Sequence, residues 1–264
     1  MTLIESLAFG CLQGITEFLP VSSSGHLAIL KSLFSLQEVP RLFDVLLHAA
    51  TLCVVVMIFR RTLKDLMAAS IRALLRRPQE DDSRKMRLIA AITAATLVTG
   101  IAGIALKDLG LEARPKIVSG LLLVTALILL ISKKRENREG PRSPGLREGL
   151  ITGLAQGIGV LPGISRSGIT ITAALLAGVN RREAGEFSFL LSLPAITGAL
   201  VLSLKEGAEL TAIAPPSVLA AGILASALTG CISLHLLLKL IRGGKLWLFA
   251  FYLVPAGTLG LIFL

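Results

Sequence analysis

QGITEFLPVSSSGH (residues 13–26) and QGIGVLPGISRSGI (residues 156–169) are two polar, glycine-rich stretches that lie 143 positions apart within apolar sequence. Aligned without a gap, they share a Gln, an Ile, two Ser and two Gly. Glu17 and His26 occur only in the first stretch, and Arg166 occurs only in the second. Duplicated, hydroxyl-rich sequence with ionisable residues at membrane depth is typical of a site built between two internal repeats.

The composition is that of a membrane protein. The 264 residues are 53% hydrophobic and 17% charged, with a mean hydropathy of +0.78, which leaves too little polar surface for a soluble protein of this size. The net charge of +10 comes from short loops between apolar segments, and the chain has only one Trp and one Tyr. This pattern does not resemble a nucleic-acid-binding surface. We therefore predict a polytopic membrane protein that contacts membrane lipids and has no nucleic-acid partner.

Six apolar runs are long enough to span, or nearly span, a bilayer. They are residues 43–59, 88–106, 117–132, 187–204, 217–238 and 246–264. The polar stretches lie in two other segments, 3–36 and 146–178, which Pro and Gly break near the middle. Each half of these segments, at about 14 to 17 residues, rises only about 21 to 25 Å as a helix. We expect both segments to be re-entrant helix-loop-helix hairpins, because irregular backbone is tolerated at membrane depth only where it lines a polar cavity.

The loop charges predict how the two hairpins are oriented. Four loops, 60–87, 133–148, 180–186 and 239–245, hold 20 of the 27 Lys and Arg, whereas the loops predicted for the other face hold six. The basic loops fall on one side only if both hairpins are re-entrant. Each half then has one hairpin and three crossings, so the second hairpin enters from the face opposite the first. The two tips are expected to meet near mid-membrane, with both termini and the first hairpin outside.

The predicted fold is therefore an all-α integral membrane protein with an inverted-topology repeat and about ten helical segments. A single membrane domain covers residues 1–264. Repeat one spans 1–135, a Gly/Pro linker spans 136–145, and repeat two spans 146–264.

Gln13 and Glu17 are four residues apart, so they share one helical face just before Pro20 ends the helix. A carboxylate at that depth requires compensation by a metal ion, an arginine or a water-filled cavity. One alternative is that Glu17 pairs with Arg166 only to hold the hairpins together.

His26 directly follows Ser22, Ser23 and Ser24. A lone histidine in a membrane protein often serves packing or hydrogen bonding, but its place beside three hydroxyls and near Glu17 favours a catalytic role. Asp44 and its neighbour on the helical face, the histidine at position 48, either extend the polar cavity or reach the membrane interface.

The second stretch contains the groups of an oxyanion receptor. Arg166 offers a planar guanidinium, Ser165 and Ser167 offer hydroxyl donors, and Thr170 adds another at the start of the next helix. Phosphate suits this set best, because its charge is spread over several oxygens. Close helix packing is the alternative explanation; it accounts for the glycines but not for Arg166.

These residues resemble the motifs of the undecaprenyl-diphosphate phosphatase family, also called bacitracin-resistance proteins. The first family motif, Glu or Gln followed after three residues by Glu, is met by Gln13 and Glu17 and continues as FLPVSSSGH. The second, PGxSRSxxT, is met in full by residues 162–170, and EFSF at 186–189 is also similar. The resemblance runs nearly end to end. The one departure is Gln13, where many members carry a carboxylate, and this bears on a direct metal contact at that position.

The resemblance implies an enzyme of the bacterial cytoplasmic (inner) membrane with an outward-facing site. It implies removal of the terminal phosphate from a C55 isoprenoid diphosphate with a divalent cation, Mg²⁺ or Ca²⁺, which recycles the lipid carrier for cell-wall synthesis and confers bacitracin resistance. The catalytic residues are then Glu17, Ser23, His26 and Arg166, and the phosphate-binding residues are Gln13, Ser22, Ser24, Ser165, Ser167 and Thr170.

Several alternatives stay open within this prediction. Glu17 either holds the cation or acts as a base. The attacking group is Ser23, which we favour, or His26 itself. A lipid-phosphate transporter of the inverted-repeat type would need the phosphate clamp but not the nucleophile. A membrane-embedded serine protease gives Arg166 no role. A homodimer is a further alternative that the sequence leaves open.

Overall fold

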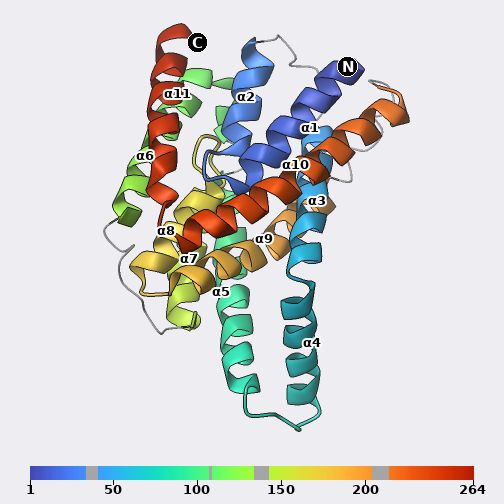
Figure 1. Cartoon of the computed structure of the whole chain (residues 1–264), viewed down its shortest axis with the longest axis vertical. Coiled ribbons are helices and arrows are strands. Elements are labelled where there is room, and N and C mark those ends of the chain that lie inside the picture. Colours follow the sequence, from blue (N-terminus) through green and yellow to red (C-terminus); the bar gives the residue numbers. More distant parts are fainter. Residues whose placement is uncertain (34–40, 107–108, 134–142, 204–213) are drawn as a thin grey trace.

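The computed structural model describes residues 1–33, 41–106, 109–133, 143–203 and 214–264, and these residues form helices and no β-strand (Figure 1). The first half contains α1 (Leu3–Phe18), α2 (Ser23–Leu33), α3 (Arg41–Ile58), α4 (Arg60–Leu74), α5 (Asp82–Leu106), the 3₁₀ turn η2 (Leu111–Ala113) and α6 (Pro115–Ser132). The second half contains α7 (Leu146–Ile158), α8 (Arg166–Leu176), α9 (Arg181–Ser203), α10 (Pro216–Arg242), the 3₁₀ turn η5 (Leu246–Phe249) and α11 (Ala250–Phe263). Most of the predicted linker, 136–142, lies outside the described residues.

Five described helical stretches are long and apolar enough to cross a membrane. They are Asp82–Leu106, Pro115–Ser132, Arg181–Val201, Pro216–Arg242 and Leu246–Phe263. A sixth crossing is counted if α3 and α4, which are bent by 74° at their junction, form one broken span. The prediction of an all-α, multi-pass membrane protein is thus confirmed. The predicted run 43–59 coincides with α3, and position 204, the end of another run, lies outside the described residues.

Both polar stretches fold as two helices joined by a turn, broken at the predicted places. α1 begins at a capping box, in which the Thr2 hydroxyl and the Glu5 carboxylate satisfy each other's backbone N–H groups. It ends at Phe18, shortly before Pro20, whose ring disfavours helical backbone in the preceding residue. Ser22 then adopts a positive φ of 70°, which reverses the chain into α2. In the second hairpin Gly163, at φ 98°, occupies the corresponding turn before α8.

Each hairpin packs against a long helix of the other half: α1 lies along α10, and α7 lies along α5. Small residues permit the close approach. A Cβ at Gly14 would lie 2.1 Å from the Thr229 hydroxyl, and one at Gly153 would lie 2.6 Å from the Ala95 Cα. Between these layers α3 packs on both α9 and α10, so the interior is built from helices of both halves.

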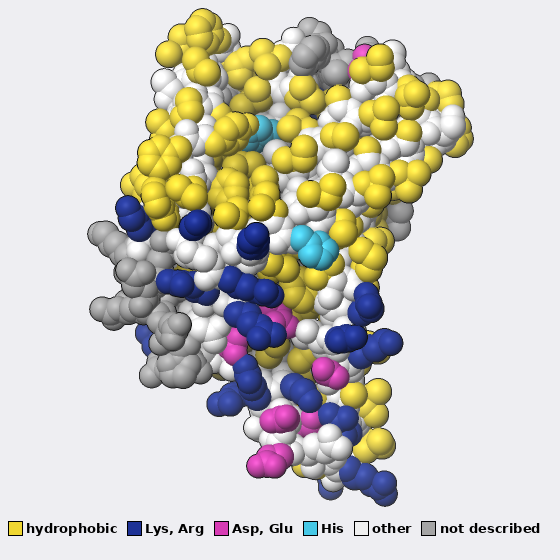
Figure 2. Space-filling view, in the orientation of Figure 1, with side chains coloured by type: hydrophobic (Ala, Val, Ile, Leu, Met, Phe, Trp, Pro, Cys, Tyr) yellow, Lys and Arg dark blue, Asp and Glu magenta, His cyan; other side chains and the backbone are white. Residues whose placement is uncertain are grey.

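The outer surface has the character of a lipid-facing protein. Ile101 on α5, Leu228 on α10 and Phe251 on α11 are 73%, 68% and 69% exposed on the isolated chain. Figure 2 shows hydrophobic side chains across the upper part of one face and Lys and Arg gathered across its middle and lower parts. The α4–α5 pair projects from the basic end (Figure 1).

Candidate active site

The two hairpin turns meet in the interior of the protein. The Gly163 N–H donates to the Ser22 Oγ at 3.0 Å, across 141 positions of sequence. The same Oγ accepts from the Gly25 N–H at 3.3 Å. A Cβ at Gly25 would lie 3.0 Å from Gly163, so glycine permits this approach. Ser22, the residue with a positive φ, therefore joins the two copies of the polar stretch.

Further hydrogen bonds fix the second turn. The Thr125 hydroxyl of α6 donates to the Gly163 carbonyl at 2.8 Å and accepts from the Ser165 N–H at 3.0 Å. The Ser167 hydroxyl donates to the Phe18 carbonyl at 3.0 Å, which ties the start of α8 to the end of α1. Ser165 caps α8, because its side chain accepts from the Gly168 N–H. Arg166 is thus placed on the first turn of a capped helix.

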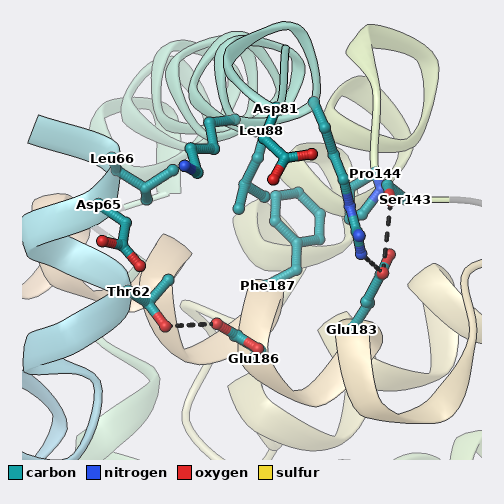
Figure 3. Close-up of a pocket in the computed structure, with 12 residues that line it drawn as sticks. Thr62, Asp65, Leu66, Asp81, Leu88, Ser143, Pro144, Glu183, Glu186 and Phe187 are labelled. Carbon is teal, nitrogen blue, oxygen red and sulfur yellow. Dashed lines mark hydrogen bonds and ion pairs between the residues drawn. The ribbon is translucent and has the colours of Figure 1, made fainter. Parts of the chain in front are cut away.

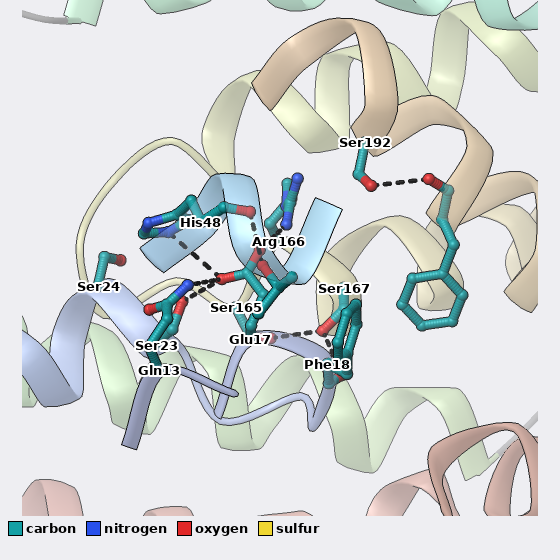
Figure 4. A network of polar contacts seen from close by, with 12 residues as sticks. Gln13, Glu17, Phe18, Ser23, Ser24, His48, Ser165, Arg166, Ser167 and Ser192 are labelled. Atoms are coloured by element: carbon teal, nitrogen blue, oxygen red, sulfur yellow. Dashed lines mark hydrogen bonds and ion pairs between the residues drawn. The ribbon is translucent and has the colours of Figure 1, made fainter. Parts of the chain in front are cut away.

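Glu17 lies at the centre of a polar network contributed by four elements (Figure 4). Its Oε2 accepts from the Ser23 hydroxyl at 2.6 Å and from the Gln13 Nε2 at 3.0 Å. The His48 Nε2 of α3 lies 3.3 Å from the same oxygen. Its Oε1 pairs with the Arg166 guanidinium of α8. The predicted carboxylate and arginine are therefore brought together, with a hydroxyl beside them.

The buried charge of Glu17 is compensated by its neighbours in this network. The Glu17 side chain is 3% exposed, whereas the Arg166 side chain is 22% exposed. Removing a carboxylate from water is costly unless a cation or donors surround it, and here the Arg166 cation and the Ser23 and Gln13 donors do so. The more exposed guanidinium faces the cavity and remains able to meet an incoming anion.

A cavity of about 340 Å³ opens beside this network. Glu17, Ser23, His48 and Arg166 form part of its lining. Apolar side chains that include Ile164 and Ile196 form another part. A phosphate group next to an apolar chain suits such a lining, since polar groups fix orientation and apolar walls take up hydrocarbon.

The other predicted phosphate-binding residues divide into two groups. Ser22, Ser24 and Ser165 line the cavity. Gln13, Ser167 and Thr170 do not: Gln13 is fully buried behind Glu17, and Ser167 bonds to the Phe18 carbonyl. Thr170 is fully buried; its hydroxyl donates to the Arg166 carbonyl at 2.7 Å and lies within hydrogen-bond distance of the Ser188 hydroxyl. The second group supports the site from behind.

His26 lies apart from the Glu17 network. Its Nδ1 bonds to the Ser22 carbonyl at 2.8 Å, and its Nε2 bonds to the Tyr252 hydroxyl of α11 at 2.8 Å. The two rings are stacked, with centroids 5.6 Å apart. His26 is not among the residues that line the cavity. Its catalytic role stays a prediction, while its contacts here hold the first turn against α11.

His48 lies in the site, although the sequence left open whether it extends the polar cavity or reaches the membrane interface. Its Nδ1 donates to the Asp44 carbonyl at 2.8 Å, which orients Nε2 toward Glu17. The carboxylate of Asp44, one turn earlier, pairs with Lys31 of α2. The sequence offered one signal for His48: it lies four residues after Asp44, so the two share one face of α3. That spacing does not tell which residues of other helices the face meets.

A divalent cation fits this site only with help from the substrate. In the part of the chain that the structure describes, no three His, Cys, Asp or Glu residues are grouped to hold a metal ion. Glu17 supplies one carboxylate, Ser23 a hydroxyl oxygen, and the buried Gln13 Oε1 has no hydrogen-bond partner. Mg²⁺ is often held by one or two carboxylates together with substrate phosphates. The oxygen donors present are compatible with that arrangement.

Comparison with known proteins gives a consistent result. The family model described as "Bacitracin resistance protein BacA" matches residues 6–259. An undecaprenyl-diphosphatase of Treponema denticola is 45% identical over 257 residues, which cover 97% of this chain and 96% of that protein. Undecaprenyl-diphosphatases of Korarchaeum cryptofilum and Methanosphaera stadtmanae are 39% and 37% identical, covering 97% and 99% of this chain and 97% and 98% of those proteins.

Proposed function

The chain belongs to the bacitracin resistance protein BacA family, and we propose how its site performs the hydrolysis that its relatives' name describes. The protein is a membrane hydrolase that converts undecaprenyl diphosphate and water into undecaprenyl phosphate and inorganic phosphate, and so serves peptidoglycan synthesis. One observation supports the assignment of roles best. Glu17 is held against the Ser23 hydroxyl and the Arg166 guanidinium, which come from opposite hairpins.

Arg166 binds the diphosphate. In the free protein its guanidinium is neutralised by Glu17, so an incoming phosphate competes with a carboxylate for the same cation. Ser165, on the cavity wall, and the backbone N–H groups at the start of α8 add donors. A guanidinium fork can bond two phosphate oxygens at once, which fixes the orientation of the terminal phosphoryl group.

Ser23 is the nucleophile in this proposal. Its hydroxyl proton is directed to Glu17 Oε2 at 2.6 Å, so Glu17 can accept it as Ser23 Oγ bonds to the terminal phosphorus. The phosphoanhydride bond breaks and undecaprenyl phosphate leaves with its bonding electron pair. Water then attacks the phosphoserine, which releases inorganic phosphate and restores the hydroxyl. His26, the other candidate nucleophile, is already bonded through both ring nitrogens to Ser22 and Tyr252.

A divalent cation, Mg²⁺ or Ca²⁺, completes the charge balance in this proposal. Glu17 and Ser23 would hold it together with the substrate's phosphate oxygens, and Gln13 offers its unpartnered Oε1. When bound, the cation supplies positive charge to the phosphoryl oxygens and the leaving group. The isoprenoid chain is accommodated along the apolar part of the cavity, near Ile164 and Ile196.

We further propose that the two halves are inverted repeats with re-entrant hairpins. The exchange in packing supports this: α1 lies on α10 and α7 on α5, as expected when equivalent elements swap partners. The loop charges support an outward-facing site in the cytoplasmic membrane. Cysteines introduced at positions 112 and 140, after replacement of Cys11, Cys53 and Cys231, should be labelled from opposite sides. Labelling of both from one side would contradict the inverted arrangement.

The site is tested by phosphate release from a polyprenyl diphosphate, using purified protein with and without EDTA. Ser23→Ala and Arg166→Ala are expected to reduce release to near background. His26→Ala tests the remaining candidate nucleophile: loss of release in His26→Ala together with retained turnover in Ser23→Ala would transfer that role to His26. Equal release by all variants and wild type would refute the site.

A further inference from the structure

A second cavity, of about 220 Å³, lies where α3 meets α4 and where α9 begins and α10 ends. Three arginines line it, Arg181 and Arg182 from the start of α9 and Arg242 from the end of α10. We name it the arginine pocket. Ala195, which lines the catalytic cavity, lies 13 residues after Arg182 on the same helix, or about 20 Å along its axis. The two cavities are therefore separate.

The three guanidinium groups have no counter-ion in the described part of the chain. None of the three forms an ion pair there, although Arg72, Arg84 and Arg166 each do. The Arg181 Nε is buried and has no hydrogen-bond partner. Like charges gathered in one cavity repel one another, and a buried unpaired donor costs free energy. An anion bound between the three would relieve both costs.

One carboxylate, Glu186, also lines the arginine pocket, so three positive charges there face one negative charge. Glu186 accepts a hydrogen bond from the Thr62 hydroxyl at 2.8 Å (Figure 3). The neighbouring cavity in Figure 3 is different, since Asp65, Asp81 and Glu183 join Glu186 in its lining, and Glu183 is paired with Arg84. Acidic side chains thus gather in that cavity and leave the arginine pocket with an excess of positive charge.

The remaining wall of the arginine pocket is apolar. It is formed by Ile58 and Phe59 at the end of α3 and by Leu238 and Ile241 on the last turns of α10. Leu238 and Ile241 lie near the end of a membrane-crossing segment, and Ile58 and Phe59 lie at the bend between α3 and α4. A soluble anion would use only the arginines, whereas the headgroup and first carbons of a lipid would use the arginines and the apolar wall.

We propose that the arginine pocket binds the phosphate of an anionic membrane lipid. Guanidinium groups bind phosphate oxygens through paired N–H donors, and basic pockets between transmembrane helices recognise acidic headgroups. The bound lipid would join the α3–α4 junction to α9 and α10. This proposal does not depend on the chemistry assigned to Glu17 and Ser23.

The test compares two triple variants with the same change of charge. Arg181→Gln, Arg182→Gln and Arg242→Gln empty the arginine pocket. The control carries Lys64→Gln, Arg77→Gln and Arg87→Gln at exposed positions outside it. Each protein is reconstituted in nanodiscs of phosphatidylglycerol and phosphatidylcholine, and retained lipid is measured by native mass spectrometry. Phosphate release, measured in the same preparations, confirms that the variants are folded.

Wild type and the control should retain phosphatidylglycerol in preference to phosphatidylcholine, and the pocket variant should retain it at least about tenfold less, given roughly 1 kcal/mol per basic residue. Equal retention by the two triple variants would overturn the proposal, as would equal retention of the two lipids. Inorganic phosphate is added in a separate arm. Displacement of the lipid by an equal concentration of phosphate would assign the pocket to a soluble anion and refute lipid binding.

Discussion

His48 is predicted to position Glu17, and two substitutions separate that role from simple packing. His48→Ala removes the ring that lies 3.3 Å from the Glu17 Oε2. His48→Gln replaces it with a side chain of similar reach, whose amide N–H can donate to the same oxygen. If the contact acts by orienting the carboxylate toward Ser23, glutamine should restore what alanine loses.

The size of the effect follows from the geometry. A hydrogen bond to a charged group contributes about 1.5–3 kcal/mol. The 3.3 Å separation is long for such a bond and the His48 side chain is 26% exposed, so the contribution of this contact lies around or below the lower end of that range. About 1–2 kcal/mol of lost positioning corresponds to a decrease in rate of roughly 5- to 30-fold.

Steady-state phosphate release over a range of polyprenyl diphosphate concentrations measures the effect. His48→Ala should lower kcat by that factor with a smaller change in KM, and His48→Gln should stay within about threefold of wild type, because its amide N–H can donate to the same Glu17 oxygen. Thermal unfolding of both variants checks that the fold is intact. The reasoning is wrong if His48→Ala turns over like wild type, or if His48→Gln is as impaired as His48→Ala.

Three further outcomes follow from the same structure. Arg166→Gln should lower kcat/KM by roughly 10²–10³-fold. Arg166→Lys should recover only part of that loss, because lysine keeps the positive charge but lacks the guanidinium fork that bonds two phosphate oxygens. Full recovery of kcat/KM by lysine would exclude bidentate phosphate binding. EDTA should abolish release, and either Mg²⁺ or Ca²⁺ should restore it; unchanged activity in EDTA would remove the cation from the mechanism. Gly14→Ala should destabilise the protein by about 1–3 kcal/mol, since its Cβ would lie 2.1 Å from Thr229 Oγ1, whereas Gly120→Ala, with open space around its Cβ, should not lower the melting temperature.

Much of the architecture could be predicted because it depends on local chemistry. Apolar runs long enough to span a bilayer fold as helices, and Pro20 and Gly163 mark the breaks in the two hairpins. The bend between α3 and α4 was not predicted. It occurs where the apolar residues of α3 give way to Arg60 and Arg61, and its angle depends on packing that periodicity does not encode.

The site was predictable where its residues are ionisable and embedded in apolar sequence. Glu17 and Arg166 each lack local compensation, so they require partners, and the structure pairs them across 149 positions. His26 and His48 were harder to assign. His26 is oriented by Tyr252, which lies 226 residues later, and His48 reaches Glu17 only because α3 packs beside the first hairpin. Both relationships arise from tertiary packing alone.

The pairing of Glu17 with Arg166 also bears on how the protein is made. The carboxylate is synthesised 149 residues before its partner, which at 5–20 residues per second is a delay of about 7 to 30 seconds. During this interval the first hairpin carries a charge that hydrocarbon does not tolerate. Until then the Glu17 carboxylate must be protonated, or must stay in contact with water at the insertion machinery. Final seating of the first hairpin is then a late event, completed only when the second hairpin arrives, and a chain interrupted between the two would leave an unseated N-terminal segment for quality control to recognise.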